Sequence, residues 1–185
     1  VSLVAFARSG REATAAPRLG DHWHTAYDIY VCDTYRGKIV NENDPNGIHT
    51  HGDGLMHIHP FNSLASGKNA TIGEFFRSFG GMIDDTSIRL DTGETITEGF
   101  DCGGEPTVLK VARFDAQDRF RAPQVITEGL DTVRYFKNLE AITVAFVPEG
   151  VEPPLPRAER FTFLETVDPR AISSGNSEAP TTTAG

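Results

Sequence analysis

Apolar and polar positions alternate along much of the chain with a period of two, a pattern that predicts β-strands. In residues 22–32, Trp23 and Tyr27 fall on one face of the expected strand. His22 and His24 fall on the other face, because successive side chains of a strand point in opposite directions. Further strands are predicted at 55–61, 87–90, 94–98, 108–114, 132–136 and 141–147, which alternate in this way or are rich in β-branched and aromatic residues.

One segment changes to the period of a helix. Apolar residues recur at positions i, i+3, i+4 and i+7 through residues 72–79. Thr71 and Glu74 have the spacing of a capping box at the start of this segment, and Gly80 and Gly81 follow its end. We therefore expect a short amphipathic helix whose phenylalanines belong to the core.

The order of these elements predicts an α+β fold. We expect a mainly antiparallel or mixed β-sheet with one packed helix, in a β-grasp-like arrangement, and a cupin-like β-barrel is the alternative. Residues 157–167 are compatible with a weak second helix. The pattern predicts a single globular β-rich domain at 21–167, preceded by a flexible segment or anchor remnant at 1–20. Residues 168–185, rich in Ser, Thr, Pro and Gly, predict a disordered tail.

All six histidines fall into three His-x-His pairs. On a strand, each pair presents two imidazoles on the same face. The turn residues 52–54 (GDG) separate two short runs that carry two of the pairs, and two hairpin registers remain open. One register places His49 opposite His57, and the other places His51 opposite His57. In both registers four histidines share one face: His49, His51, His57 and His59.

Imidazoles gathered in this way predict a transition-metal site. His22 and His24 join the four hairpin histidines if the fold brings their strand alongside. Zinc or copper(II) is favoured, because copper(I) sites usually recruit Met or Cys, and Met56 points away from the histidines. The alternative without a metal is a polar sheet face whose histidines hydrogen-bond to the backbone or to one another. The nearest carboxylates in sequence are Asp21, Asp28, Asp53 and Glu74, of which Asp53 suits a turn role best.

Net charge and cysteine content indicate which kinds of partner and which cellular compartment the sequence favours. The formal net charge of −9 disfavours nucleic acid or an anionic membrane surface as a partner. Cys32 and Cys102 are the two cysteines, and we expect one disulfide between them rather than two buried thiols. Residues 1–7 are apolar but shorter than the ~20 residues of a membrane-spanning helix. Any contact with a membrane is therefore expected only through an N-terminal anchor.

Four blocks of the chain resemble uncharacterised membrane-anchored or secreted envelope proteins of actinobacteria. They are residues 20–32 (GDHWHTAYDIYVC), 47–61 (GIHTHGDGLMHIHPF), 67–76 (GKNATIGEFF) and 142–150 (ITVAFVPEG). The resemblance implies an extracytoplasmic location in the cell envelope. It implies no particular chemistry.

Three functions are compatible with these observations. The leading hypothesis is an extracytoplasmic metal-binding domain that stores, delivers or senses zinc or copper. The second is a metalloenzyme with an open position at a His-ligated metal, for which the sequence identifies no catalytic residue. The third is an interaction subunit of an envelope protein complex.

Overall fold

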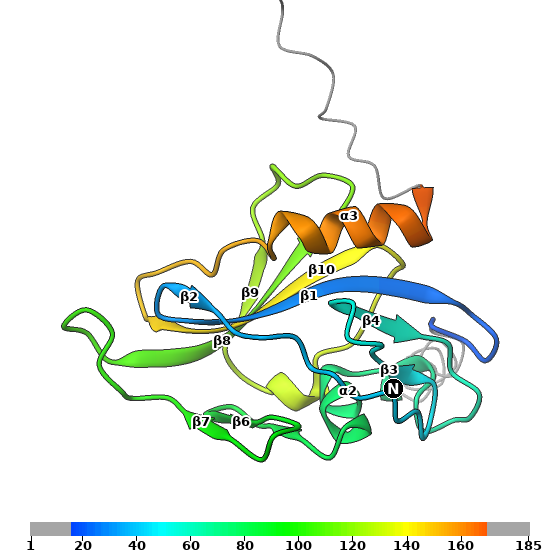
Figure 1. The fold of residues 1–185 in the computed structure, drawn as a ribbon, viewed down its shortest axis with the longest axis horizontal. Helices are drawn as coiled ribbons and strands as arrows, with labels where there is room; N and C mark the ends of the chain where they lie inside the picture. Colours follow the sequence, from blue (N-terminus) through cyan, green and yellow to red (C-terminus); the bar gives the residue numbers. More distant parts are fainter. Residues whose placement is uncertain (1–15, 170–185) are drawn as a thin grey trace, which may run out of the picture.

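A mixed seven-stranded sheet organises residues 16–169, the part of the chain that the computed structural model describes (Figure 1). The strand order is β3-β4-β1-β10-β8-β9, and β2 pairs with β1 outside this path. β1 and β10 lie parallel, and all other neighbours in the sheet are antiparallel. The strands are β1 (Trp23–Val31), β2 (Thr34–Tyr35), β3 (Ile48–His49), β4 (Leu55–Ile58), β8 (Thr107–Asp115), β9 (Gln124–Ile126) and β10 (Glu140–Pro148).

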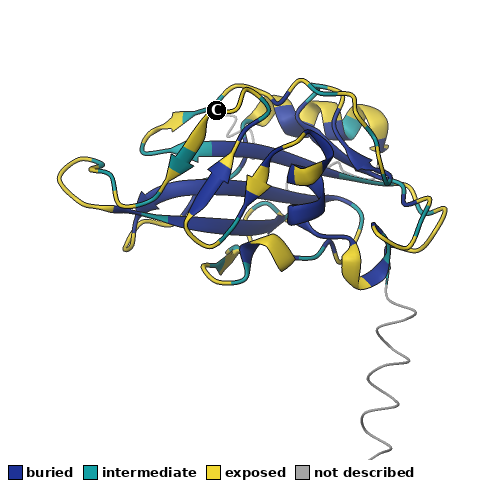
Figure 2. Ribbon diagram, turned by 90° about the horizontal axis from the view of Figure 1, so that it is seen from below, coloured by how far each residue is buried: buried dark blue, intermediate teal, exposed yellow. Residues whose placement is uncertain are grey.

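The centre of the main sheet is buried on both faces. Every residue of β10 is buried, as expected for a strand with a parallel neighbour and covered faces, and Figure 2 shows the long central strands in the colour of buried residues. One core cluster contains Tyr27 and Ile29 of β1 together with the helix phenylalanines. A second cluster contains Ala26 of β1 and Phe161. The alternation predicted for β1 therefore sorts its side chains into two separate cores.

Different elements cover the two faces (Figure 1). Helix α2 (Ile72–Ser78) packs on one of them, and the Thr71 side chain accepts a hydrogen bond from the Glu74 amide at its start. Helix α3 (Ala158–Val167) lies on the opposite face. The remaining elements are the 3-10 turns η1 (Gly67–Asn69) and η2 (Leu130–Thr132) and a small sheet of β5 (Met82–Ile83), β6 (Ser87–Arg89) and β7 (Thr95–Thr97).

A buried ionic network fixes α3 against the sheet. Asp28 on β1 accepts hydrogen bonds from the guanidinium groups of Arg157 and Arg160. Arg160 is only 1% exposed and lies against Gly54, where an added Cβ would be 2.3 Å from the arginine Cδ. The Gly54 carbonyl also accepts a hydrogen bond from the Tyr27 amide. The network therefore positions the turn before β4 as well as the helix.

The α+β prediction is confirmed, with α2 and the β6–β7 hairpin where the sequence placed them. The first and last long strands, β1 and β10, lie side by side and parallel, and each pairs with an antiparallel strand on its other side. This order is compatible with the β-grasp-like arrangement. The sheet does not close, so the cupin-like barrel is wrong. The expected single helix is joined by α3, at the position of the weak second helix.

The strand predicted at 132–136 is wrong. Only one bridge forms there, between Arg134 and Thr71, after the turn η2. Val133 and Tyr135 are buried, and the Tyr135 hydroxyl donates to the Met56 sulfur at 2.9 Å. The apolar alternation of this segment thus reflects packing under the core rather than strand pairing.

The predicted ends fall mostly outside the described residues. Of the predicted segment 1–20, only 16–20 are described, and there the Pro17 carbonyl accepts from the Gly67 amide and the Gly20 amide donates to Pro60. Of the predicted tail 168–185, only residues 168 and 169 are described. No helix within residues 16–169 combines the length and apolar character needed to cross a membrane.

The predicted disulfide is confirmed. Cys32, directly after β1, is bonded to Cys102 in the loop before β8, with 5.5 Å between their Cα atoms. Disulfides form and persist in oxidising compartments. The bond therefore indicates an extracytoplasmic environment.

Candidate metal centre

Strand pairing aligns three histidines across the sheet. His49 on β3 is the register partner of His57 on β4, and His57 is the partner of His24 on β1. Of the two registers left open by the sequence, the structure adopts the one that places His49 opposite His57. The strand bearing His22 and His24 also lies alongside, so the condition for those two to join the others is met.

The six imidazoles form a closed ring of neighbours. Three of them, His24, His49 and His57, lie on paired strands. The other three lie within two residues of the ends of these strands, so the six rings converge at one end of the sheet. Successive ring centroids lie 4.6–5.4 Å apart in the order His22, His24, His57, His51, His49 and His59, after which His22 closes the ring. All six sequence-predicted residues are thus brought together, and five of them belong to two candidate ligand groups.

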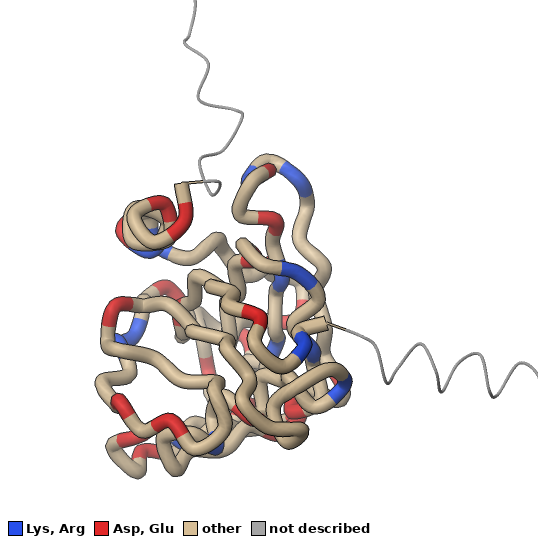
Figure 3. Tube along the Cα trace, turned by 90° about the vertical axis from the view of Figure 1, so that its right-hand side faces the viewer, with Lys and Arg blue, Asp and Glu red and all other residues tan. Residues whose placement is uncertain are grey.

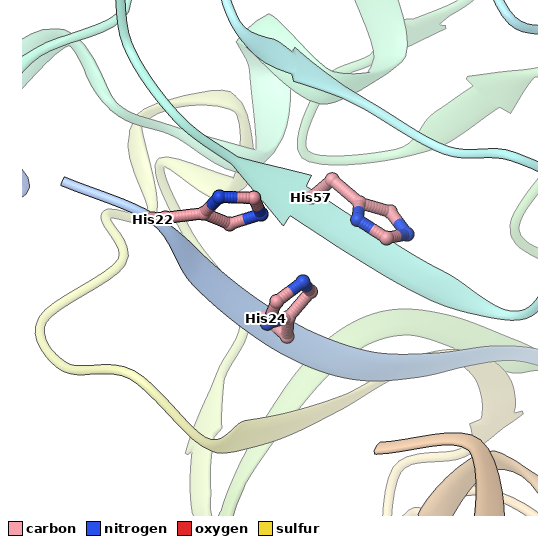
Figure 4. Close-up of side chains that lie close together, drawn as sticks. All are labelled: His22, His24 and His57. Atoms are coloured by element: carbon pink, nitrogen blue, oxygen red, sulfur yellow. The ribbon is translucent and has the colours of Figure 1, made fainter. Parts of the chain in front are cut away.

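The first group consists of His22, His24 and His57. Their ligand atoms all lie within 4.8 Å of one another, and Figure 4 shows nitrogen atoms of the three rings turned toward a common space. The Nδ1 atom of His24 is buried and makes no hydrogen bond. Because buried polar atoms almost always have a partner, each exception asks for an explanation such as an ion. A metal ion at this point would supply that partner.

Asp53 orients the third ligand of this group. Its Oδ2 lies 2.8 Å from Nε2 of His57, which leaves Nδ1 of that ring for a metal. A carboxylate bonded to the second nitrogen of a metal-bound imidazole fixes its tautomer and raises its basicity. The Oδ1 atom of Asp53 accepts a hydrogen bond from the Leu55 amide, so the predicted turn role is also present.

The second group consists of Asp44, His49 and His59. Oδ2 of Asp44 lies 3.2 Å from Nδ1 of His49 and 3.7 Å from Nε2 of His59. Its Oδ1 accepts a hydrogen bond from the Gly47 amide at 2.5 Å, which closes the turn before β3. Asp44 is not among the residues predicted from the sequence. The available sign was the Asp-Pro-Asn-Gly turn directly before the histidine runs.

His51 belongs to neither group and contacts both. It is exposed, its Nε2 lies 3.0 Å from Nε2 of His49, and its ring centroid lies 4.6 Å from that of His57. One of the two facing nitrogens must carry the proton of the shared hydrogen bond. This contact leaves Nδ1 of His49 directed at the second group.

The other carboxylates named from the sequence serve different contacts. Asp28 is paired with Arg157, directly before α3, and with Arg160 in α3. Glu74 accepts hydrogen bonds from Asn46 and Arg77. Asp21 accepts from the Arg18 amide. Figure 3 views the molecule from the side on which β3 and β4 lie in Figure 1, and acidic and basic positions are interspersed along the trace.

No protein-family model, curated protein or solved structure matches this chain. The binding chemistry of the domain is therefore inferred from the geometry of the six histidines and their carboxylate neighbours.

Burial keeps several of these histidines neutral. Burial, reinforced by neighbouring histidines, lowers the pKa of His24 to about 4. The pKa of His49 is also lowered to about 4, chiefly by burial and against the opposing effect of Asp44. Burial lowers the pKa of His22 as well. Neutral imidazoles are the form that binds metals, so the site is ready for an ion at neutral pH.

These shifts predict a pH-dependent stability of the metal-free protein. Between the folded pKa of about 4 and the ordinary value of 6.5, the unfolded chain binds more protons than the folded chain. The free energy of unfolding should therefore rise with pH across this window, by at most about 1.4 kcal/mol per pH unit for each group and less where solvent screens the charge. Urea unfolding at a series of pH values with a chelator present measures the slope, which should be shallower in His24→Ala. Identical slopes for the two proteins would contradict the lowered pKa of His24.

Proposed function

We propose that this domain binds a transition-metal ion, zinc or copper(II), in an extracytoplasmic compartment. The ligands are His22, His24 and His57, and Asp53 orients His57. The observation that carries this proposal is the unpartnered, buried Nδ1 of His24 beside two further imidazoles whose ligand atoms lie within 4.8 Å. In the alternative without a metal, the histidines hydrogen-bond to the backbone or to one another. The Nδ1 atom of His24 then remains without a partner.

The surroundings favour zinc or copper(II) over copper(I). Imidazole suits both preferred ions, whereas copper(I) sites usually recruit thioether or thiolate ligands. The Met56 sulfur accepts a hydrogen bond from Tyr135 in the core on the opposite face. Both cysteines are bonded to each other in the disulfide, so neither offers a thiolate to an ion.

Location and exposure support a role in storing, delivering or sensing the ion. The disulfide argues for an oxidising compartment, and the resemblance to actinobacterial envelope proteins argues for a secreted or membrane-anchored domain in the cell envelope. His22 and His51 are exposed, so an ion can exchange with solvent at the rim of the ring.

A metalloenzyme is the second candidate. Three protein ligands leave a coordination position open, and catalytic zinc sites keep such a position for water or substrate. An ion held by His22, His24 and His57 alone would have this property. A bound ion with four protein ligands would argue against catalysis.

The test of the proposal is the metal content of protein produced without a His-tag. After reconstitution with zinc or copper(II) and removal of loosely bound ions, elemental analysis should find at least about one equivalent per chain. Less than about 0.2 equivalents of every transition metal would overturn the proposal.

Asp53→Asn should weaken zinc binding by about 10–100-fold, the usual effect of losing a carboxylate behind a ligating histidine. The amide oxygen can still accept from Leu55, so the turn is retained. Asp84→Asn is the matched control, because Asp84 also caps a turn, between β5 and β6, where its carboxylate accepts hydrogen bonds from Thr86 and Ser87. Competition with a chromophoric chelator measures both affinities, and equal affinities would show that Asp53 serves the turn alone.

A further inference from the structure

We propose that Asp44, His49 and His59 form a second metal site, distinct in chemistry from the three-histidine site beside it. The proposal rests on the proposed function, since the two sites share one ring of imidazoles. The second site replaces one imidazole by a carboxylate. It is a two-histidine, one-carboxylate set, which suits zinc and also harder divalent ions such as iron(II), cobalt(II) and manganese(II).

The decisive atom is Nδ1 of His49. The residue is 3% exposed, and this nitrogen is buried without a hydrogen-bond partner. It nevertheless lies 3.2 Å from Oδ2 of Asp44. The two atoms are therefore close without being aligned for a hydrogen bond, as two ligands of one ion are.

The other nitrogen of His49 is already engaged. Its Nε2 lies 3.0 Å from Nε2 of His51, which fixes the ring with Nδ1 toward Asp44. His57 in the first site is held in the same way, because its Nε2 faces Asp53. Each of the two paired histidines thus has one nitrogen held by a neighbour and one directed into its own ligand group.

The carboxylate is also fixed before any ion arrives. Oδ1 of Asp44 accepts from the Gly47 amide, so Oδ2 is the atom left to face His49 and His59. Gly47 itself has a φ of +94°, and a Cβ there would meet the His59 carbonyl oxygen at 2.3 Å. The backbone of the turn is therefore closely packed against the residue that supplies the third ligand.

The two sites adjoin across the ring. His22 of the first group contacts His59 of the second, with ring centroids 5.4 Å apart, and His49 stacks on His57 at 5.6 Å. The exposed His51 contacts a member of each group. The centre therefore holds two ions side by side, and the negative charges of Asp44 and Asp53 offset part of their mutual repulsion.

Cobalt(II) titration of protein already loaded with one equivalent of zinc tests the second site. Visible absorption of bound cobalt(II) should saturate at about one further equivalent. Asp44→Asn keeps the acceptor for the Gly47 amide but removes the charge, and it should lower cobalt(II) affinity at least about 10-fold. The same variant removes no ligand of the first site, so it should lower the zinc affinity there by a smaller factor than the cobalt(II) affinity of the second site. Asp53→Asn is the matched control. It should lower the zinc affinity of the first site more than the cobalt(II) affinity of the second site.

The outcomes separate the two proposals. Binding of one equivalent in total, lost in His24→Ala but unchanged in Asp44→Asn, would overturn the second site and leave the proposed function intact. A cobalt(II) affinity equal in Asp44→Asn and the unaltered protein would also overturn it. Failure to bind any metal would overturn both.

Discussion

Replacing His24 with alanine is expected to weaken zinc binding at the three-histidine site by at least about 100-fold. Binding free energies of structural zinc sites are about 10–16 kcal/mol and are shared among few ligands, so each ligand matters. His24 is also the register partner of His57, and its Nδ1 is the unpartnered atom of the group. Competition titration with a chromophoric chelator measures the loss.

The matched control for this change is Tyr30→Ala. Tyr30 lies on the same face of β1, toward the other end of the strand, and its ring contacts Tyr35. Its loss perturbs β1 without removing a histidine, so zinc affinity should stay within about 3-fold of the unaltered protein. An unchanged affinity in His24→Ala, or an equal loss in Tyr30→Ala, would contradict the assigned ligand set.

Asp28→Ala is expected to cause the largest loss of stability. It leaves the guanidinium of Arg160, which is 1% exposed, without its buried carboxylate partner, and breaking a buried ion pair on one side costs about 3–5 kcal/mol. For a chain of this size, a loss of that order corresponds to a decrease in Tm of about 10 °C. Urea and thermal unfolding of the metal-free protein measure the change.

An exposed ion pair gives the comparison. Arg36 and Glu94 are 37% and 45% exposed at their side chains, so Glu94→Ala should cost less than about 1 kcal/mol. The double variant Asp28→Leu with Arg160→Met should recover much of the loss, since both fully buried charges are then removed and the remaining guanidinium of Arg157 is 32% exposed. Similar losses in Asp28→Ala and Glu94→Ala would show that the buried network does not hold α3 and the turn at Gly54.

Local patterns were sufficient for much of the fold. The alternation around Trp23 and Tyr27 predicted β1, and the helical period after Thr71 predicted α2 with its cap. The same reasoning failed at 132–136, because burial of Val133 and Tyr135 imitates a strand without providing a pairing partner. Short-range alternation records which residues are buried, whereas strand pairing depends on contacts that are distant in sequence.

The site was predictable to the extent that it follows from strand geometry. Parity along the hairpin indicated that His49 and His57 share a face, and the pairing of β4 with β1 then added His24. Asp44 could not be found in this way. Its position depends on the path of an irregular loop, set by a turn bond to Gly47 rather than by any periodicity. The Asp-Pro-Asn-Gly sequence indicates a turn before His49, but only the folded loop shows that the Asp44 carboxylate lies beside His49 and His59.

X-ray absorption spectroscopy at the zinc edge, on protein loaded with one equivalent of zinc, shows whether the histidines bind the metal. We expect about three imidazole nitrogens at ~2.0–2.1 Å from the metal, with the outer-shell scattering of imidazole rings. The three-imidazole pattern should be reduced in His24→Ala. Zinc surrounded by oxygen alone, without imidazole scattering, would contradict a histidine-ligated metal centre.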